Sequence, residues 1–217
     1  MPDDRESLNR LLMRSVELER DLSDLFRFDD FGISPRWSTS RVICAIAFEH
    51  AESAKLLANA GNFTSSVGLL RLQFEALVRA FWLYYGASDA AVEKLAAELT
   101  HESAQRANNL PMAAEMLEQL KQSQCPPVAV DQLSEFREYS GKALNSFVHG
   151  GLHAIRRHDS GYPVELLLNL IRQSNGLSLM AGQLLVILHG GRTLTGSLPQ
   201  LHLKYMDCLP EPKGLTL

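Results

Sequence analysis

Residues 69–84 read LLRLQFEALVRAFWLY and predict a helix that is apolar on almost every side. A helix of that kind is usually buried, so we expect neighbouring elements around it. Thr64 or Ser65 can serve as its N-cap residue, and Gly86 marks its end. The composition agrees with a helical fold, because leucine outnumbers valine and isoleucine together.

The rest of the chain repeats apolar residues at three- and four-residue steps, and no segment alternates as a strand does. Caps and helix breakers divide this pattern into about seven helices, at residues 5–27, 38–60, 64–85, 88–106, 110–123, 128–157 and 164–189. Short connections favour antiparallel neighbours and predict an all-α, up-and-down bundle. We expect one domain over residues 1–217, with an acidic N-terminal helix and connector at 1–35 and a tail at 192–217 that holds a short helix near 200–208.

The charge distribution limits the partners. The formal net charge of −4 lies in residues 1–30, which hold nine acids and five arginines, and the remaining residues are balanced. Nucleic-acid binding would therefore require a local basic patch. No P-loop, dinucleotide-binding or serine-hydrolase motif is present, and we expect no cofactor.

The cysteines and the hydropathy bear on localisation. The three cysteines stand far apart and in no zinc-binding spacing, which fits a reducing compartment with thiols packed as small apolar groups. The N-terminus carries no apolar signal-peptide segment, and the longest uncharged run, 173–188, is too short to span a bilayer. We therefore expect a cytoplasmic protein without a membrane partner.

A charged stripe interrupts the apolar helix at 64–85. Arg71, Glu75 and Arg79 follow each other at four-residue steps, so they share one side of the helix, together with Gly68. One interpretation is a solvated stripe held by ion pairs. The other is a charged line that faces the bundle interior or a cleft, where charges must be paired.

A second polar strip is predicted on the helix at 128–157. On a continuous helix the buried face would be formed by Leu144, Phe147, Val148, Gly151, Ala154 and Ile155. The opposite side would present Lys142, Asn145, His149, His153 and Arg156, and no acid occurs from residue 139 to 158. The strip is either an ordinary solvated face or a site for a phosphate-rich ligand such as RNA, with a histidine as general acid or base.

Metal binding is a further interpretation of the same strip. His149 and His153 have the four-residue spacing of two helical metal ligands, and a third ligand such as His50 or Glu75 would be needed. His50 otherwise reads as a core histidine in a helix rich in alanine. The pair Gly150-Gly151 predicts either a break in the helix or a close approach of another backbone.

These motifs resemble those of bacterial all-helical proteins related to the HEPN superfamily. The resemblance lies within residues 40–155 and rests on His50-x2-Ser53, Leu70-Arg71-x3-Glu75-x3-Arg79 and Asn145-Ser-Phe-Val-His149-Gly150. It implies a helical bundle, often a homodimer. Many HEPN proteins are metal-independent RNases in toxin–antitoxin and phage-defence systems. Asn145 and His149 match the polar residue and the histidine of their motif, whereas Leu144 stands where the motif has arginine.

Two functions of different classes follow from the resemblance and the strips. The first is a non-catalytic HEPN-like protein that binds an antitoxin-like protein partner or a small ligand, and the missing motif arginine favours it. The alternative is a metal-independent RNase that uses His149 as acid and base, and the basic strip favours it. Its remaining catalytic residues would be Asn145, Arg71 and Glu75, and its binding residues Lys142, His153, Arg156, Arg79 and His50. A metal-binding bundle is the second alternative.

Overall fold

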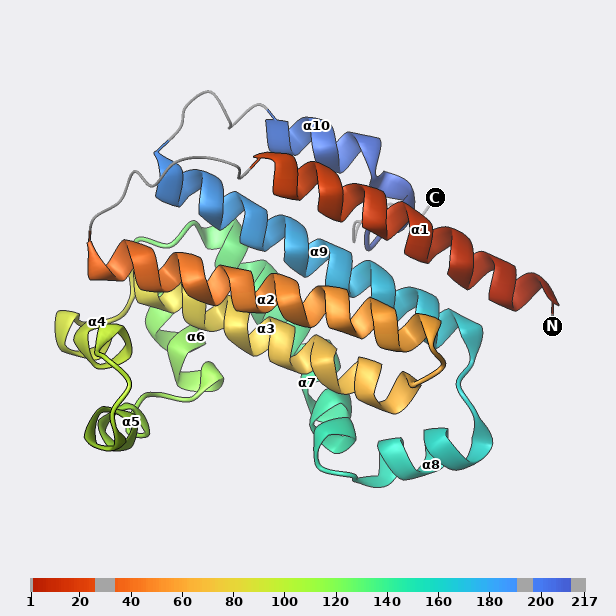
Figure 1. Cartoon of the computed structure of the whole chain (residues 1–217), viewed down its shortest axis with the longest axis horizontal. Coiled ribbons are helices and arrows are strands. Elements are labelled where there is room, and N and C mark those ends of the chain that lie inside the picture. The colour runs from red at the N-terminus through yellow and green to blue at the C-terminus, as the bar shows by residue number, and fades with distance from the viewer. Residues whose placement is uncertain (1, 26–33, 191–196, 212–217) are drawn as a thin grey trace.

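The computed structural model describes residues 2–25, 34–190 and 197–211, and no strand occurs among them. These ranges form ten α-helices and one 3-10 turn (Figure 1). In chain order they are α1 (Pro2–Leu25), α2 (Pro35–Asn59), α3 (Phe63–Tyr85), α4 (Asp89–Ala96), α5 (His101–Ala107), α6 (Ala113–Lys121), α7 (Pro127–Val148), α8 (Leu152–Ser160), α9 (Val164–His189), α10 (Ser197–Lys204) and the 3-10 turn η1 (Met206–Cys208). The all-α prediction is confirmed.

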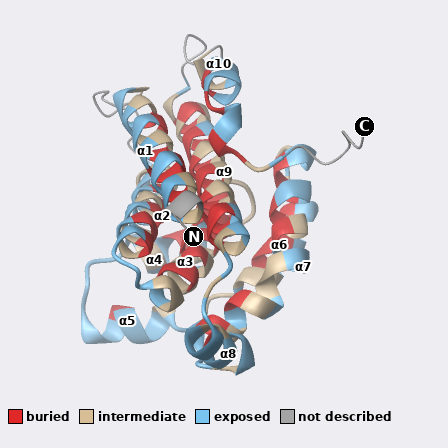
Figure 2. Ribbon diagram, turned by 90° about the vertical axis from the view of Figure 1, so that its right-hand side faces the viewer, coloured by how far each residue is buried: buried red, intermediate tan, exposed pale blue. Residues whose placement is uncertain are grey.

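Helix α3 is the buried helix that its sequence predicts. It contacts α2, α6, α7, α8 and α9. Leu77, Val78 and Leu83 are fully or almost fully inaccessible to solvent, and Ser65, Leu72 and Arg79 are its exposed residues. Figure 2 shows buried residues on α3 and α9 facing the interior, whereas α5 and α8 are mostly exposed.

Helices α2 and α3 form an antiparallel pair with the most extensive contact in the fold. Apart from Lys55, the buried residues of α2 are small, which lets its backbone approach those of α3 and α9. Two buried serines also join the pair, because Ser40 Oγ donates to the Ala80 carbonyl at 2.8 Å and Ser66 Oγ to the Ala54 carbonyl at 2.7 Å. Gly61 makes the turn between the helices with a φ of +81°, a conformation that favours glycine.

The helix count of about seven is too low, because two predicted helices are each divided. The helix expected at 88–106 is α4 and α5. Thr100 and Ser103 form a capping box that starts α5 anew, and a cap of this kind satisfies backbone groups that a continuous helix would pair internally. The helix expected at 128–157 is α7 and α8, separated at Gly150, whose φ is +63°. The break is the first of the two outcomes that the glycine pair predicts.

Helices lie near both ends of the described chain. Helix α1 begins at Pro2, and α10 begins at residue 197, a few residues before the expected short helix. Residues 26–33, which include most of the connector predicted at 28–35, lie outside the described residues, and so do residues 191–196 and 212–217, which include parts of the predicted tail.

All three cysteines are reduced and buried, as the composition suggests. Burial raises the pKa of the Cys44 thiol to about 12 and the pKa values of the Cys125 and Cys208 thiols to about 11. Because the thiolate is the reactive form of cysteine, these side chains act as apolar packing groups. None of the described helices has the length and hydropathy that crossing a bilayer would require.

Candidate functional site

The charged stripe of α3 meets the predicted polar strip at a junction between α3 and α7. Arg71 Nε donates to Glu75 Oε1 at 2.7 Å, and Arg71 Nη1 donates to Asn145 Oδ1 on α7. The Arg71 and Glu75 side chains are 21% and 36% exposed. The stripe therefore lies at the edge of the bundle, where its guanidinium is paired but still reaches solvent. Arg79 is exposed and lies outside this cluster.

His149 is the C-cap residue of α7 and is exposed. Its backbone N–H donates to the Asn145 carbonyl at 3.2 Å, and its side chain is exposed. The chain then turns at Gly150, and the Gly151 N–H donates to the Ser146 carbonyl at 2.7 Å. A Cβ on Gly151 would lie 2.7 Å from Ser146 Oγ, so a side chain at this position would have to displace that hydroxyl. Ser146 Oγ in turn accepts a hydrogen bond from the His153 N–H at 2.9 Å and fixes the start of α8.

The prediction of one continuous polar strip is therefore wrong. Lys142 and Asn145 belong to α7, whereas His153 and Arg156 belong to α8, which leaves the axis of α7 at the glycine pair. The predicted buried face is correct for Leu144, Phe147 and Ala154 and wrong for Val148 and Ile155, which are exposed. The break changes which residues share a face, because helical periodicity does not continue through a left-handed glycine.

Other predicted site residues stay apart from the junction. Among the described residues, no hydrogen bond or ion pair joins His50, Arg79, Lys142 or Arg156 to Arg71 or Asn145. His50 is half-buried on α2. The part of the chain that the structure describes holds no group of three His, Cys, Asp or Glu side chains that could share a metal ion. Glu75, one of the suggested third ligands, is instead paired with Arg71.

A groove with a volume of about 800 Å³ lies between α7, α9 and the C-terminal segment. It follows α9 from Gln173 to Ile187, a length of about 20 Å at 1.5 Å per residue. Its walls are mainly apolar and include Phe136, Leu177, Met180, Ile187, Leu198 and Pro210. Its polar lining includes Gln132, Glu135, Gln173, Gln183, His202 and Glu211. Ligand pockets typically combine this volume with an apolar wall and a few polar groups.

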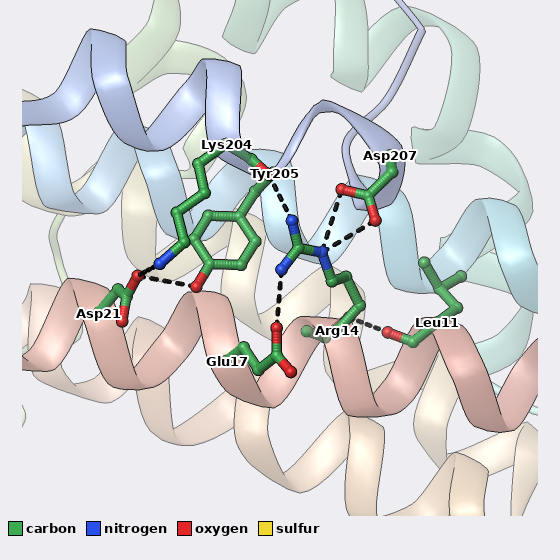
Figure 3. Close-up of polar contacts among 8 residues, drawn as sticks. Leu11, Arg14, Glu17, Asp21, Lys204, Tyr205 and Asp207 are labelled. Carbon is green, nitrogen blue, oxygen red and sulfur yellow. Dashed lines mark hydrogen bonds and ion pairs between the residues drawn. The ribbon is translucent and has the colours of Figure 1, made fainter.

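The C-terminal wall of the groove is held against α1 by ion pairs (Figure 3). Arg14 Nε donates to Asp207 at 2.9 Å, and Lys204 Nζ donates to Asp21 at 2.6 Å. The Tyr205 hydroxyl also donates to Asp21, at 2.7 Å, and the Arg14 guanidinium lies 4.3 Å from the centre of the Tyr205 ring. We refer to these five residues as the terminal clamp. The hydrogen bonds from Lys204 and Tyr205 lower the pKa of the Asp21 carboxyl.

A buried polar network, which the sequence analysis did not identify, lies behind the groove. Lys55 of α2 is only 4% exposed, and its Nζ donates to Glu19 of α1 at 2.5 Å. It also donates to Ser174 Oγ at 3.4 Å, and Ser174 Oγ donates to Gln73 Oε1 at 2.7 Å. Burial lowers the pKa of the Lys55 amine, and the nearby Glu19 carboxylate opposes that shift.

This network joins α1, α2, α3 and α9 through side chains in their contact faces. Beside it, Asn175 makes a separate set of buried hydrogen bonds, since its Nδ2 donates to Ser15 Oγ and to the Cys208 carbonyl, both at 2.8 Å. A signal for it exists in the sequence. Ser174, Asn175 and Ser178 interrupt an otherwise apolar helix, and polar residues in such a place require buried partners.

A protein-family model matches residues 44–211 and thus most of the chain. The chain belongs to DUF6988, a family of unknown function. The DUF6988 region contains the complete groove lining, the α3–α7 junction and Lys55, whereas α1 lies outside it. No curated protein and no solved structure matches the chain.

Proposed function

We propose that this DUF6988 protein is a non-catalytic binding protein whose groove between α7 and α9 takes a ligand with an apolar body. The observation that carries the proposal is the groove itself, with its volume of about 800 Å³ and its mainly apolar walls. Burying apolar surface there supplies affinity in proportion to the area removed from water. This is the small-ligand form of the binding function that the sequence favours.

The α3–α7 junction supports a structural role for the charged residues. Arg71 already donates to Glu75 and to Asn145, so its guanidinium is committed to protein acceptors. His149 is exposed, and general acid–base catalysis needs a histidine held within hydrogen-bond reach of its substrate. The junction accordingly joins two helices, while the groove offers the enclosed apolar surface that binding requires.

A homologous series of primary alcohols, hexanol to decanol, tests the proposal by isothermal titration calorimetry below the concentrations at which they aggregate. We expect the affinity to rise about fourfold for each added methylene, which corresponds to ~0.8 kcal/mol, with a negative heat-capacity change. Met180→Trp places a large ring in the groove and should abolish binding. Leu56→Trp on the exposed face of α2 is the matched control and should leave binding unchanged. Alcohol binding that is equal in both variants would show that the groove is not the site.

A second candidate function is metal-independent RNA cleavage, and one contact favours it. The Arg71 guanidinium lies on Asn145, one helical turn before His149, where it could supply the cation that Leu144 does not. If this is the function, purified protein should cleave a mixed RNA pool equally with and without EDTA, and His149→Ala should not. Cleavage that is equal in the wild type and in His149→Ala would indicate a contaminant.

The HEPN resemblance also leads us to propose an assembly, a partner and a functional setting for this protein. A homodimer, an antitoxin-like partner and a place in a toxin–antitoxin or phage-defence system all follow from that resemblance. Sedimentation equilibrium over a range of protein concentrations tests the dimer, because a dimer dissociates on dilution whereas a monomer keeps one mass. The genes that flank the coding sequence test the functional setting.

A further inference from the structure

The outer side of the α2–α3 pair carries apolar side chains that stay exposed in the described structure. Val42, Ile46 and Leu72 are 51%, 37% and 39% exposed, although each belongs to a helix whose opposite side is packed into the core. Exposed apolar residues that are scattered singly are ordinary, whereas a contiguous group of them marks an interaction surface. The position of these three residues relative to each other therefore decides their meaning.

The two serine hydrogen bonds between α2 and α3 fix the register of this antiparallel pair. In that register Ile46 lies less than one helical turn from the level of Leu72, and Val42 lies about one turn from Ile46. Helices α2 and α3 lie side by side (Figure 1) and both contact α9, so the sides that they turn away from α9 point in the same direction. The three side chains therefore form one apolar group, which we call the hairpin patch.

A carboxylate and a guanidinium lie at opposite ends of the hairpin patch. Glu49 belongs to α2, and Arg79 of α3 is the member of the charged stripe that lies outside the α3–α7 junction. Both side chains are exposed, and neither has an ion-pair or hydrogen-bond partner among the described residues. In the register of the pair they are about 12 Å apart along the helices, and the levels of all three apolar residues fall between them.

A surface of this composition is complementary to itself. In a dimer with a twofold axis one patch meets its own copy, so that residue i contacts residue j and j contacts i. An axis midway between Glu49 and Arg79 brings each of them to the other residue of the second copy and brings the two apolar centres together. A polyanion such as a nucleic acid would instead meet the Glu49 carboxylate, which disfavours its approach.

We propose that the outer face of α2 and α3 binds a second copy of this chain, with Ile46 and Leu72 at the centre of the interface and two Glu49–Arg79 ion pairs at its ends. This inference rests on the homodimer in the proposed function and adds the surface and the contacts that form it. The residues of the hairpin patch do not line the groove between α7 and α9, so ligand binding in the groove is a separate property.

Reversal of the two charges tests the interface by sedimentation equilibrium, which measures the dissociation constant of the dimer. We expect Glu49→Arg and Arg79→Glu each to raise that constant by about tenfold or more, because each substitution creates two contacts between like charges. An equimolar mixture of the two variants is the decisive sample. In the mixed dimer one chain carries two positive charges and the other two negative charges, so both ion pairs are restored and the affinity should return to about that of the wild type.

A mixture that associates as weakly as the separate variants would overturn the inference. Recovery in the mixture also shows that both variants are folded, because unfolded chains would not restore a specific interface. Glu102→Arg on α5, another exposed carboxylate, is the matched control for charge and should leave the dissociation constant unchanged.

The apolar centre is tested separately. Leu72→Glu should abolish the dimer, and Leu203→Glu, at a leucine of α10 that is 69% exposed, is the matched control and should have no effect. A dimer that survives Leu72→Glu would overturn the inference and leave the homodimer in place. A wild-type protein that stays monomeric at every concentration would overturn the homodimer and this inference together, whereas ligand binding in the groove would still depend on its own titration.

Discussion

Gly176 of α9 lies against Pro210, so closely that a Cβ at position 176 would stand 3.0 Å from Pro210 Cγ and 3.2 Å from Pro210 Cδ. Both residues line the groove. The missing side chain at 176 is thus what lets the C-terminal segment pack on α9 and form one wall of the groove. A proline ring has little freedom to yield, so an added methyl group at 176 must move the backbone of that wall.

We predict that Gly176→Ala and Gly68→Ala have opposite effects on stability. Both glycines lie inside helices, where alanine is intrinsically preferred by ~1 kcal/mol. A Cβ on Gly68 would make only an ordinary contact, 3.9 Å from Val148, so Gly68→Ala should raise the free energy of unfolding. Gly176→Ala should lower it by ~1–3 kcal/mol through overpacking and should weaken decanol binding. Urea unfolding of both variants checks this, and an equal gain in stability would contradict the packing of Pro210 on α9.

Removal of Lys55 alone should lower the free energy of unfolding strongly. Removal of Lys55 together with Glu19 should lower it less. Lys55→Met leaves Glu19, whose side chain is 21% exposed, without its cation, and breaking a buried pair typically costs ~3–5 kcal/mol. Glu19→Gln combined with Lys55→Met removes both charges, and we expect it to recover a large part of that loss. Chemical denaturation of the two single variants and the double variant completes a double-mutant cycle. Additive losses would mean that the two charges do not interact.

The terminal clamp predicts a dependence of stability on pH. The pKa of Asp21 is lowered in the folded protein, so its contribution is complete above the unfolded pKa of about 3.9 and is lost as the pH falls through the folded value. The Asp21 side chain is 30% exposed, which limits the contribution to below about 1 kcal/mol and makes it weaker at high salt. Asp21→Asn should flatten the acid limb of the stability profile at low salt. Profiles of equal slope for the wild type and the variant would show that the clamp adds nothing.

Loss of the Arg71–Glu75 ion pair should lower the free energy of unfolding only slightly. The pair is an i,i+4 pair at the edge of the bundle, so Glu75→Gln should cost less than about 1 kcal/mol rather than the several kcal/mol of a buried pair. Glu118→Gln in α6 breaks an exposed i,i+3 pair with Lys121 and is the matched control. Thermal unfolding of both variants measures the difference. A loss above about 3 kcal/mol for Glu75→Gln alone would indicate that the pair is effectively buried.

The fold class was predictable because helical periodicity is a local property. The apolar composition of residues 69–84 by itself predicts a buried helix. Helices α2, α3 and α9 begin and end close to the expected residues. The pair Gly150-Gly151 indicated the break between α7 and α8, but it did not indicate which side chains would share a face after the break. Which side chains share a face after the break depends on a φ of +63° and on the contact between Ser146 and α8, and neither is encoded in spacing.

The candidate site was less predictable, for a physical reason. Arg71 and Asn145 were singled out by residue type, and the structure does bring them into contact. The groove was missed because its walls are ordinary apolar helix faces, such as those at Leu177 and Met180, which read as core. A sequence pattern shows that a face is apolar and does not show whether a neighbouring helix fills the space in front of it.

The terminal clamp has a consequence for where this chain can be shortened. Residues 44–211 match the family, yet the segment that ends at Glu211 is held in place by Arg14 and Asp21 of α1. Leu18 and Leu22 of α1 are completely buried, and so is almost all of Tyr205. A protein cut at the first matched residue would expose this interface at one end and lose the support of the groove wall at the other. The unit that sequence comparison recognises is therefore smaller than the unit that must fold together.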